Sequence, residues 1–382
     1  MGFTFQTTPS VLVEAGGSAK IGEIFARLGC RSVLVVTDRG VEGAGLLRRA
    51  LEGLGAAGIG HAMFRDVVAD PPDTIVADAV AAARNAGVDG VLGLGGGSSL
   101  DVAKLAALLA SGHETLEDVY GVGLARGPRL PLVLAPTTAG TGSEVTPIAI
   151  VTTGAGEKKG VVSPPLLPDW AVLDADLTLG LPAHVTAATG IDAMVHAIEA
   201  YTSKRLKNPV SDALAREALR LLAENIGPAC RTGSDRGARE NMLLGSMLAG
   251  MAFANAPVAA VHALAYPIGG LFHVPHGLSN AMVLPHVVRF NAPVAADLYA
   301  ELAAIIVPSA AGSADARTAE LVRTLADLAP RLGLDTRLRS AGITSDDLPK
   351  LATDAVKQTR LLVNNPREVT YDDALAIYAD AL

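Results

Sequence analysis

The chain has 382 residues, 50% hydrophobic and 18% charged, so it can bury a large core and global disorder is excluded. Lysine and arginine total 31 against 39 aspartates and glutamates, a net charge of −8 without a strongly basic segment, which argues against a nucleic-acid or anionic-membrane surface. The two cysteines, Cys30 and Cys230, form no CxxC pair, which argues against a disulfide scaffold or a thiolate zinc site. Because no basic and apolar leader opens the sequence, we expect a cytoplasmic protein.

The first half of the chain alternates short apolar runs with helical patterns. In chain order these patterns predict a strand at 32–37, a helix at about 45–53, a helix at 73–86, a strand at 88–94, a helix at 100–109, and strands at 132–135 and 171–173. Such alternation indicates βαβ units around a largely parallel sheet. From about residue 186 the chain is rich in alanine and leucine, has helical periodicity and contains no convincing strand. We therefore predict an α/β domain over residues 1–180 and an all-helical domain over residues 181–382.

A long stretch between Glu240 and Arg289 contains no charged side chain. Its part from 242 to 272 is apolar enough to resemble a membrane-spanning helix. Pro257 and Pro267 interrupt the run, and no basic flank lies close to it, so we interpret it as buried helices and expect no membrane insertion. Its histidines then need partners, because a buried imidazole must be hydrogen-bonded or bound to a metal.

A glycine-rich segment, GLGGGS at 93–98, follows a predicted strand and opens a helix. Glycines let the backbone approach a phosphate, and the helix N-terminus offers free N–H groups. We interpret it as a phosphate site, although an ordinary turn would look similar and the usual dinucleotide fingerprint lies in an earlier turn. Upstream, Asp38 ends a predicted strand, where a carboxylate could hold ribose hydroxyls and favour NAD over NADP. A plain helix N-cap explains Asp38 equally well.

A second loop rich in hydroxyl groups, PTTAGTGSE at 136–144, follows the predicted strand at 132–135. Such a loop can donate several hydrogen bonds to a phosphate or a ribose, and open α/β sheets bind ligands at the carboxyl ends of their strands. Lys158 and Lys159 precede the next apolar run. Either could contact a cofactor, but surface lysines are the more common outcome.

Four side chains in the second half have the character of a metal site. Asp192 and His196 are four residues apart, so on a helix they share one face. His262 and His276 lie in the charge-free stretch, with prolines and glycines that let the chain turn between them. One carboxylate and three imidazoles suit a divalent first-row metal such as iron or zinc. A lone histidine in such surroundings would more often be a core residue.

Four segments resemble the signature segments of the iron-containing, group III alcohol dehydrogenases, and they are GGGSSLDVAK (95–104), PTTAGTGSEVT (136–146), TGIDAMVHAIEAYTS (189–203) and HALAYPIGGLFHVPHGLSNAMVLPHV (262–287). The resemblance spans essentially the whole chain. It implies a dehydroquinate synthase-like fold, with a Rossmann-like dinucleotide-binding domain followed by an all-helical, metal-binding domain.

The resemblance also implies roles for individual residues. The implied metal ligands are Asp192, His196, His262 and His276. The implied dinucleotide contacts are Asp38, Gly95, Gly96, Gly97, Ser98, Asp101, Thr137, Thr138, Thr146 and Lys158. Many members of the family have a second histidine four residues after the third ligand, a position that Tyr266 occupies here. Tyr266 or His273 is therefore the expected catalytic proton relay.

The implied activity is that of a metal-dependent, NAD-linked alcohol dehydrogenase or aldehyde reductase acting on a small alcohol, diol or hydroxy acid. Fe²⁺ is the expected ion, with Zn²⁺ as the alternative, because carboxylate and imidazole accept both. We expect a homodimer or larger homo-oligomer and no nucleic-acid partner. A metal-independent reductase of the same fold, similar to maleylacetate reductases, is the alternative function. That alternative predicts disrupted ligands, whereas all four are present.

Overall fold

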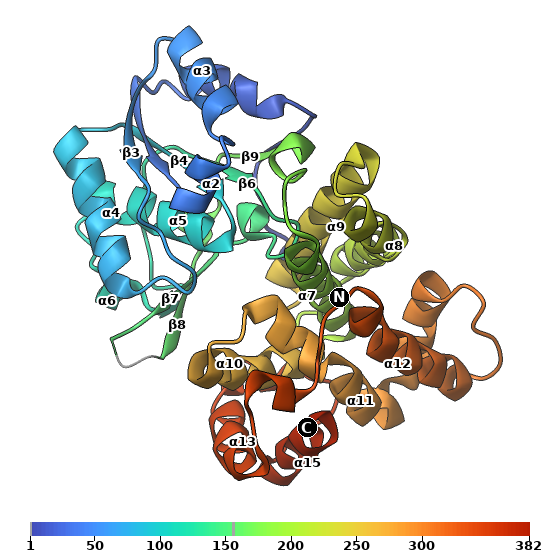
Figure 1. Ribbon diagram of the computed structural model, residues 1–382. Helices are drawn as coiled ribbons and strands as arrows, with labels where there is room; N and C mark the ends of the chain where they lie inside the picture. The colour runs from blue at the N-terminus through green and yellow to red at the C-terminus, as the bar shows by residue number, and fades with distance from the viewer. Residues whose placement is uncertain (1, 155–156) are drawn as a thin grey trace. The chain divides into compact units, whose positions relative to one another are not determined.

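The computed structural model describes residues 2–154 and 157–382, which divide into two compact units (Figure 1). One unit comprises residues 6–180. The other comprises residues 181–382 together with residues 2–5 at the start of the chain.

The unit of residues 6–180 is built on a six-stranded parallel sheet, as predicted. Its strands, in spatial order, are β1 (Ser10–Val13), β9 (Trp170–Leu173), β6 (Leu132–Pro136), β4 (Gly90–Gly95), β2 (Ser32–Val36) and β3 (Gly60–Phe64). A smaller sheet has the order β5 (Gly121–Val122), β8 (Lys158–Val162) and β7 (Ile148–Thr152). The accompanying helices are α1 (Ile21–Arg27), α2 (Arg39–Gly43), α3 (Arg48–Ala56), α4 (Asp73–Ala86), α5 (Gly97–Ser111) and α6 (Leu116–Val119).

The large sheet is buried on both faces, which explains why β2 is apolar at every position after the first. Val33 and Val35 belong to a core with buried residues of α1 and α3. Leu34 and Val36 point to the other face and belong to a core with residues of α4 and α5. Because successive side chains of a strand alternate between faces, a strand covered by helices on both sides must be apolar throughout.

The structure corrects several predicted elements. The helix predicted at about 45–53 is present as α3, but it begins at Arg48 and continues to Ala56, because Gly45 has a positive φ of 71° and separates α2 from α3. The helix predicted at 100–109 begins earlier, at Gly97, so part of the glycine-rich segment forms its first turn. The strands β1, β3, β5, β7 and β8 were not predicted. In β3, for example, the edge position leaves Gly60 and His61 exposed, so the strand lacks a continuous apolar run.

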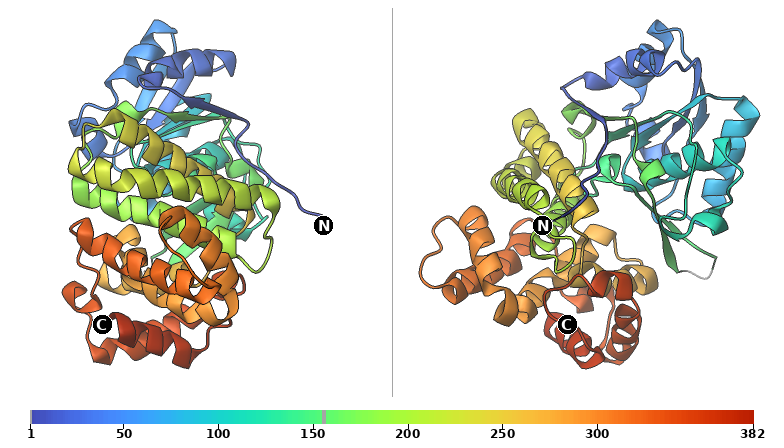
Figure 2. Two further views of the ribbon diagram at one scale, coloured as in Figure 1. Left: turned by 90° about the vertical axis from the view of Figure 1, so that its right-hand side faces the viewer. Right: turned by 180° about the vertical axis from the view of Figure 1, so that it is seen from behind.

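The second unit is helical, and none of its described residues from 181 to 382 forms a strand. Its helices are α7 (Ala183–Thr202), α8 (Pro209–Arg231), α9 (Arg236–Asn255), α10 (Ala260–Phe272), α11 (His276–Ile306, with a kink at Ala295), α12 (Ala314–Arg331), α13 (Leu348–Val356), α14 (Thr359–Leu362) and α15 (Tyr371–Ala381). Figure 2 shows α8 and α9 packed side by side, and α7 contacts both of them.

The charge-free stretch forms most of α9, all of α10 and the start of α11. Many of its apolar side chains are buried inside the helical unit, for example Met242, Leu264 and Ile268. Within the described ranges, no single helix is long and apolar enough to cross a membrane. Only α9 and α10 taken together have the length and apolar composition of a membrane-spanning segment, and the two helices are bent by 106° relative to each other.

Candidate metal centre and cofactor loops

The helix α7 presents two polar side chains on one buried face. Asp192 and His196 are one helical turn apart, and their residues are only 2% and 5% exposed. Phe253 of α9 stacks on the His196 ring, with ring centroids 4.3 Å apart and an interplanar angle of 18°. This stacking holds the imidazole in one orientation without using either of its nitrogens.

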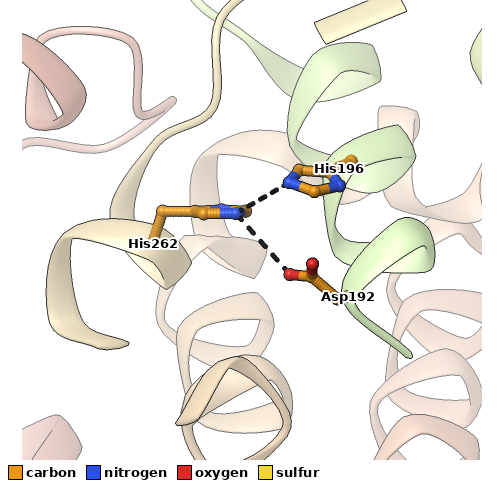
Figure 3. Close-up of side chains that lie close together, drawn as sticks. All are labelled: Asp192, His196 and His262. Atoms are coloured by element: carbon orange, nitrogen blue, oxygen red, sulfur yellow. Dashed lines mark hydrogen bonds and ion pairs between the residues drawn. The ribbon is translucent and has the colours of Figure 1, made fainter. Parts of the chain in front are cut away.

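A third side chain reaches the same point from α10. His262 directs its Nε2 atom toward α7, 3.0 Å from Nε2 of His196 and 3.9 Å from Oδ1 of Asp192 (Figure 3). Candidate ligand atoms of these three residues all lie within 4.8 Å of one another. Two imidazole lone pairs that face each other at this distance repel, unless a proton or a cation lies between them.

The fourth predicted ligand, His276, is the first residue of α11 and lies beside this group. Its Nε2 atom is 3.5 Å from Oδ1 of Asp192, and its ring centroid is 5.4 Å from that of His262. The next residue, Gly277, brings α11 against the backbone of α7 at Ala188. The structure therefore brings together all four residues that the sequence suggested as metal ligands.

Asn280, one turn after His276, also faces this group. Its Nδ2 atom donates to Oδ1 of Asp192 at 2.6 Å and lies 3.3 Å from Nε2 of both His262 and His276. Its Oδ1 atom is buried and has no hydrogen-bond partner among the described residues. The amide nitrogen of Asn280 thus lies against one carboxylate oxygen and two imidazole nitrogens, which marks a point where an electropositive group is stabilised. The donor set around it, imidazole and carboxylate, fits Fe²⁺ or Zn²⁺.

The electrostatics of Asp192 follow from the same neighbours. Burial acts to raise the pKa of Asp192, but the imidazoles of His196, His276 and His262 and the amide of Asn280 outweigh it. The net result is a pKa below the ordinary value. A carboxylate held in its ionised form is the form that binds a cation.

The sequence reasoning assigned no role to Glu199, which follows His196 by three residues on α7. Its Oε2 atom lies 2.7 Å from Nδ1 of His262, and its Oε1 atom accepts the backbone N–H of Val261 at 2.7 Å. The spacing of Asp192, His196 and Glu199 places all three on one helix face. This spacing is the feature of the sequence that could have pointed to Glu199.

The two predicted proton relays lie in different surroundings. Tyr266 packs against the histidine group: its ring is edge-on to His262, with centroids 6.5 Å apart, and 5.9 Å from the ring of His276. His273 is exposed at the end of α10, where it caps the helix in a left-handed conformation with φ of 55°.

In the α/β unit, the structure brings together the predicted cofactor segments that follow β2, β4 and β6. These strands are neighbours in the parallel sheet, so their carboxyl ends share one edge. Thr137 donates its N–H to the carbonyl of Gly95 at 3.0 Å. Asp38 caps α2 by accepting the N–H of Val41 at 2.9 Å, and its other oxygen accepts from Ser99 at 3.4 Å. The N-cap interpretation of Asp38 is therefore correct, and it leaves one carboxylate oxygen beside the glycine-rich segment.

The three consecutive glycines of that segment differ in their surroundings. A Cβ atom on Gly95 would lie 2.6 Å from the side chain of Ser99, and one on Gly97 would lie 2.7 Å from Thr141. A Cβ on Gly96 would meet nothing closer than 3.8 Å, at Thr138. Gly96 caps α5, whose first residues are Gly97 and Ser98. Close packing therefore explains the glycines at Gly95 and Gly97. The open space beside Gly96 leaves room for a ligand at the N-terminus of α5.

Two of the predicted cofactor contacts, Asp101 and Thr146, bond to neighbouring protein groups. Asp101 accepts from the hydroxyl of Ser143 at 2.6 Å and from the N–H of Ile150 at 2.9 Å. The ammonium of Lys104, which is fully buried, donates to Ser143 at 2.7 Å and to Thr146 at 3.3 Å. These hydrogen bonds hold the hydroxyl-rich loop at 136–144 in place.

Burial shifts the pKa values of Lys104 and Glu144, two ionisable side chains of this loop region. It lowers the pKa of Lys104 to about 8, although Asp101 and Glu144 oppose the change. It raises the pKa of Glu144 to about 7, and one oxygen of this carboxyl, Oε1, has no hydrogen-bond partner among the described residues.

Lys158 occupies the first position of β8 in the smaller sheet. Its Nζ atom lies 2.7 Å from Oδ1 of Asp70, and its side chain is 13% exposed. The neighbouring Lys159 lies over the ring of Tyr120, 5.5 Å from its centroid. The contact that the structure gives Lys158 is thus an ion pair within the protein.

Comparison with known proteins gives one family for both units. Residues 8–175 match the family described as iron-containing alcohol dehydrogenase, and residues 186–382 match the C-terminal part of the Fe-containing alcohol dehydrogenase family. Long-chain-alcohol dehydrogenase 1 of Geobacillus thermodenitrificans is 41% identical over 93% of this chain and 90% of its own. A crystal structure of 1,3-propanediol oxidoreductase superposes with a TM-score of 0.97 and 36% identity over the whole of both chains. Sulfoacetaldehyde reductase from Bifidobacterium kashiwanohense, in complex with NAD⁺, has a TM-score of 0.89 and 28% identity over 100% of this chain and 99% of its own.

Proposed function

Because this chain belongs to the iron-containing alcohol dehydrogenase family, we propose that Asp192, His196, His262 and His276 hold its divalent metal ion. The chain is a metal-dependent, NAD-linked alcohol dehydrogenase, which interconverts small alcohols or diols with the corresponding aldehydes or ketones. The observation that carries the assignment of ligands is the convergence of imidazole Nε2 atoms and one carboxylate oxygen on a single buried point. Fe²⁺ is the expected ion, with Zn²⁺ as the alternative.

The protein's part in the reaction is to hold the reacting groups in place. When bound, the cation would supply stabilisation of negative charge on the substrate oxygen, and the nicotinamide would supply the acceptor for the hydride of the carbinol carbon. Phe253 and Glu199 fix the orientations of two of the imidazoles. Among the two predicted proton relays, we assign the role to Tyr266, whose phenol lies against the rings of His262 and His276. His273 is the alternative.

For the cofactor, we propose that the N-terminus of α5 binds the pyrophosphate of NAD. The open space beside Gly96 supports this assignment. So does the length of α5, which has 15 residues and begins at Gly97 and Ser98, where the backbone N–H groups have no acceptor within the helix. The oxygen of Asp38 that does not cap α2 would accept from the ribose hydroxyls. Thr137 and Thr138 lie on the same edge of the sheet and would add hydroxyl donors.

The roles of Asp101, Thr146 and Lys158 at the cofactor stay predictions, since these side chains contact protein groups in the structure. We also propose a cytoplasmic location and a homo-oligomeric state. The location is supported by the two cysteines, Cys30 and Cys230, which are free thiols. The oligomeric state rests on the family resemblance, and light scattering on the purified protein tests it.

The ligand assignment is tested by removing His262. We expect His262→Ala to lose metal content, measured by elemental analysis, and NADH formation from alcohol and NAD in parallel, because only three of the four ligands remain. His184→Ala is the matched control, since His184 is an exposed histidine on α7. A His262→Ala protein with full metal content and wild-type turnover would show that the assignment is wrong.

A further inference from the structure

Glu199 makes two short bonds that link α7 to the first turn of α10. Its Oε2 atom lies 2.7 Å from Nδ1 of His262, and its Oε1 atom accepts the N–H of Val261 at 2.7 Å. The carboxylate and the imidazole are both enclosed, with 5% and 3% of their side chains exposed. Both carboxylate oxygens are therefore used, away from water.

The bond to His262 determines which ring nitrogen carries the proton. A carboxylate accepts hydrogen bonds and cannot donate them, so opposite Glu199 in its carboxylate form the Nδ1 atom of His262 is the nitrogen that carries the proton. The lone pair then lies on Nε2, the atom that faces His196 at 3.0 Å and Asp192 at 3.9 Å. A neutral imidazole in water exchanges between two tautomers, and only the one selected here can bind a cation at this point.

The bond to Val261 determines where that nitrogen lies. Val261 is the second residue of α10, so its N–H is one of the donors at a helix start that lack an intrahelical partner. The N-cap residue, Ala259, has no side chain that could accept from it. By capping α10, Glu199 ties the segment that carries His262 to the helix that carries Asp192 and His196.

We propose that Glu199 is a positioning residue of the metal centre, which selects the metal-binding tautomer of His262 and fixes the place of its Nε2 atom. This inference rests on the proposed function, because it concerns the same metal site. Partners of this kind, which bond to the far nitrogen of a metal-binding histidine, contribute about 10-fold to 100-fold in metal affinity.

The decisive variant is Glu199→Gln, which keeps the size of the side chain. A glutamine amide has one accepting oxygen and one donating nitrogen. If its oxygen accepts from Val261, its NH₂ group faces Nδ1 of His262 and favours the tautomer with a proton on Nε2. If the amide is reversed, the NH₂ group opposes the N–H of Val261. In neither orientation can it replace the carboxylate.

The experiment compares purified wild type, Glu199→Gln, Glu199→Asp and the control Glu224→Gln, in which the altered glutamate is exposed on α8. For each, the Kd for Zn²⁺ is measured by competition with a chelator, and the Tm of the metal-free protein is measured beside it. We expect Glu199→Gln to raise the Kd about 10-fold to 100-fold. Glu199→Asp, which keeps the acceptor, should recover part of the affinity, and Glu224→Gln should match the wild type.

A second readout reports the tautomer directly. In metal-free protein with ¹⁵N-labelled histidine, the ring signals of His262 should show a protonated Nδ1 in wild type and a shift toward protonated Nε2 in Glu199→Gln. A lower Tm for Glu199→Gln with unchanged Kd and unchanged tautomer would overturn the inference and leave Glu199 as a helix cap only. If Glu199→Gln does not fold, Glu199→Ala takes its place in both measurements, and a Glu199→Ala protein whose Kd and tautomer equal those of wild type overturns the inference as well. Failure of the wild type itself to bind metal would instead contradict the proposed function.

Discussion

Gly277 lies where the start of α11 touches α7, between the proposed ligand His276 and the helix that carries Asp192. A Cβ atom at this position would be 2.3 Å from the carbonyl oxygen of Ala188 and 3.4 Å from Cβ of Asp192. Cβ atoms in proteins essentially never approach such an atom within 3.0 Å, so Gly277→Ala must separate the two helices by at least 3.0 − 2.3 = 0.7 Å. Both contacting parts are helix backbone, so a side-chain rotation cannot relieve the clash.

The expected consequence of Gly277→Ala is a loosened metal site in a protein that still folds. A functional site tolerates a displacement of about 0.5 Å, and a misplacement of about 1 Å can cost about 100-fold in rate. We therefore expect kcat/KM for the alcohol to fall by about 10-fold to 100-fold, with weaker Zn²⁺ binding in the same chelator competition. Gly270→Ala is the matched control: Gly270 is a helical glycine of α10 whose Cβ would meet nothing within 4 Å. Wild-type kcat/KM and Kd in Gly277→Ala would refute the reasoning.

Two further predictions concern the α/β unit. Asp38→Gly should narrow the preference for NAD over NADP, because the carboxylate would meet the 2′-phosphate of NADP as a like charge; a wild-type kcat/KM that is higher with NADP than with NAD would contradict this. Burial raises the pKa of Glu144 from its ordinary 4.5 to about 7, so the stability it contributes is complete below pH 4.5 and is lost as the pH rises through 7. At about 1.4 kcal/mol for each of about 2.5 pH units, the full loss of stability is about 3.5 kcal/mol, and most of it falls between pH 5 and pH 8. Glu144→Gln should remove this loss from urea-unfolding curves measured over that range, whereas Glu23→Gln, at an exposed site, should leave it unchanged.

The sequence predicted those parts of the fold in which one residue pattern has one structural solution. The strand β2 lies between two helical layers, so its continuous apolar run is unambiguous. The edge strand β3 exposes His61, and its pattern resembles a loop. The break between α2 and α3 depends on the positive φ of Gly45, and a glycine in a sequence does not reveal its own φ.

In the metal site, too, the sequence predicts local neighbours but not contacts between distant segments. Asp192 and His196 are neighbours through helical periodicity, so their proximity could be predicted from spacing alone. Glu199 bonds to His262 across 63 residues and Asn280 to Asp192 across 88, and only the packing of α7 and α10 against α11 brings these pairs together. Local pattern therefore indicates the side chains that we propose as metal ligands, whereas tertiary structure is needed to find those that orient them.

The most direct test of the central claim is removal and return of the metal in the wild-type protein. The protein is treated with a chelator without oxygen, its metal content is verified by elemental analysis, and NADH formation from an alcohol and NAD is measured before and after Fe²⁺ is added. We predict that activity disappears with the metal and returns with Fe²⁺. The α/β unit should remain folded throughout, because none of the four proposed ligands lies in it. Undiminished activity in protein verified to be free of metal would contradict the account and favour a metal-independent reductase.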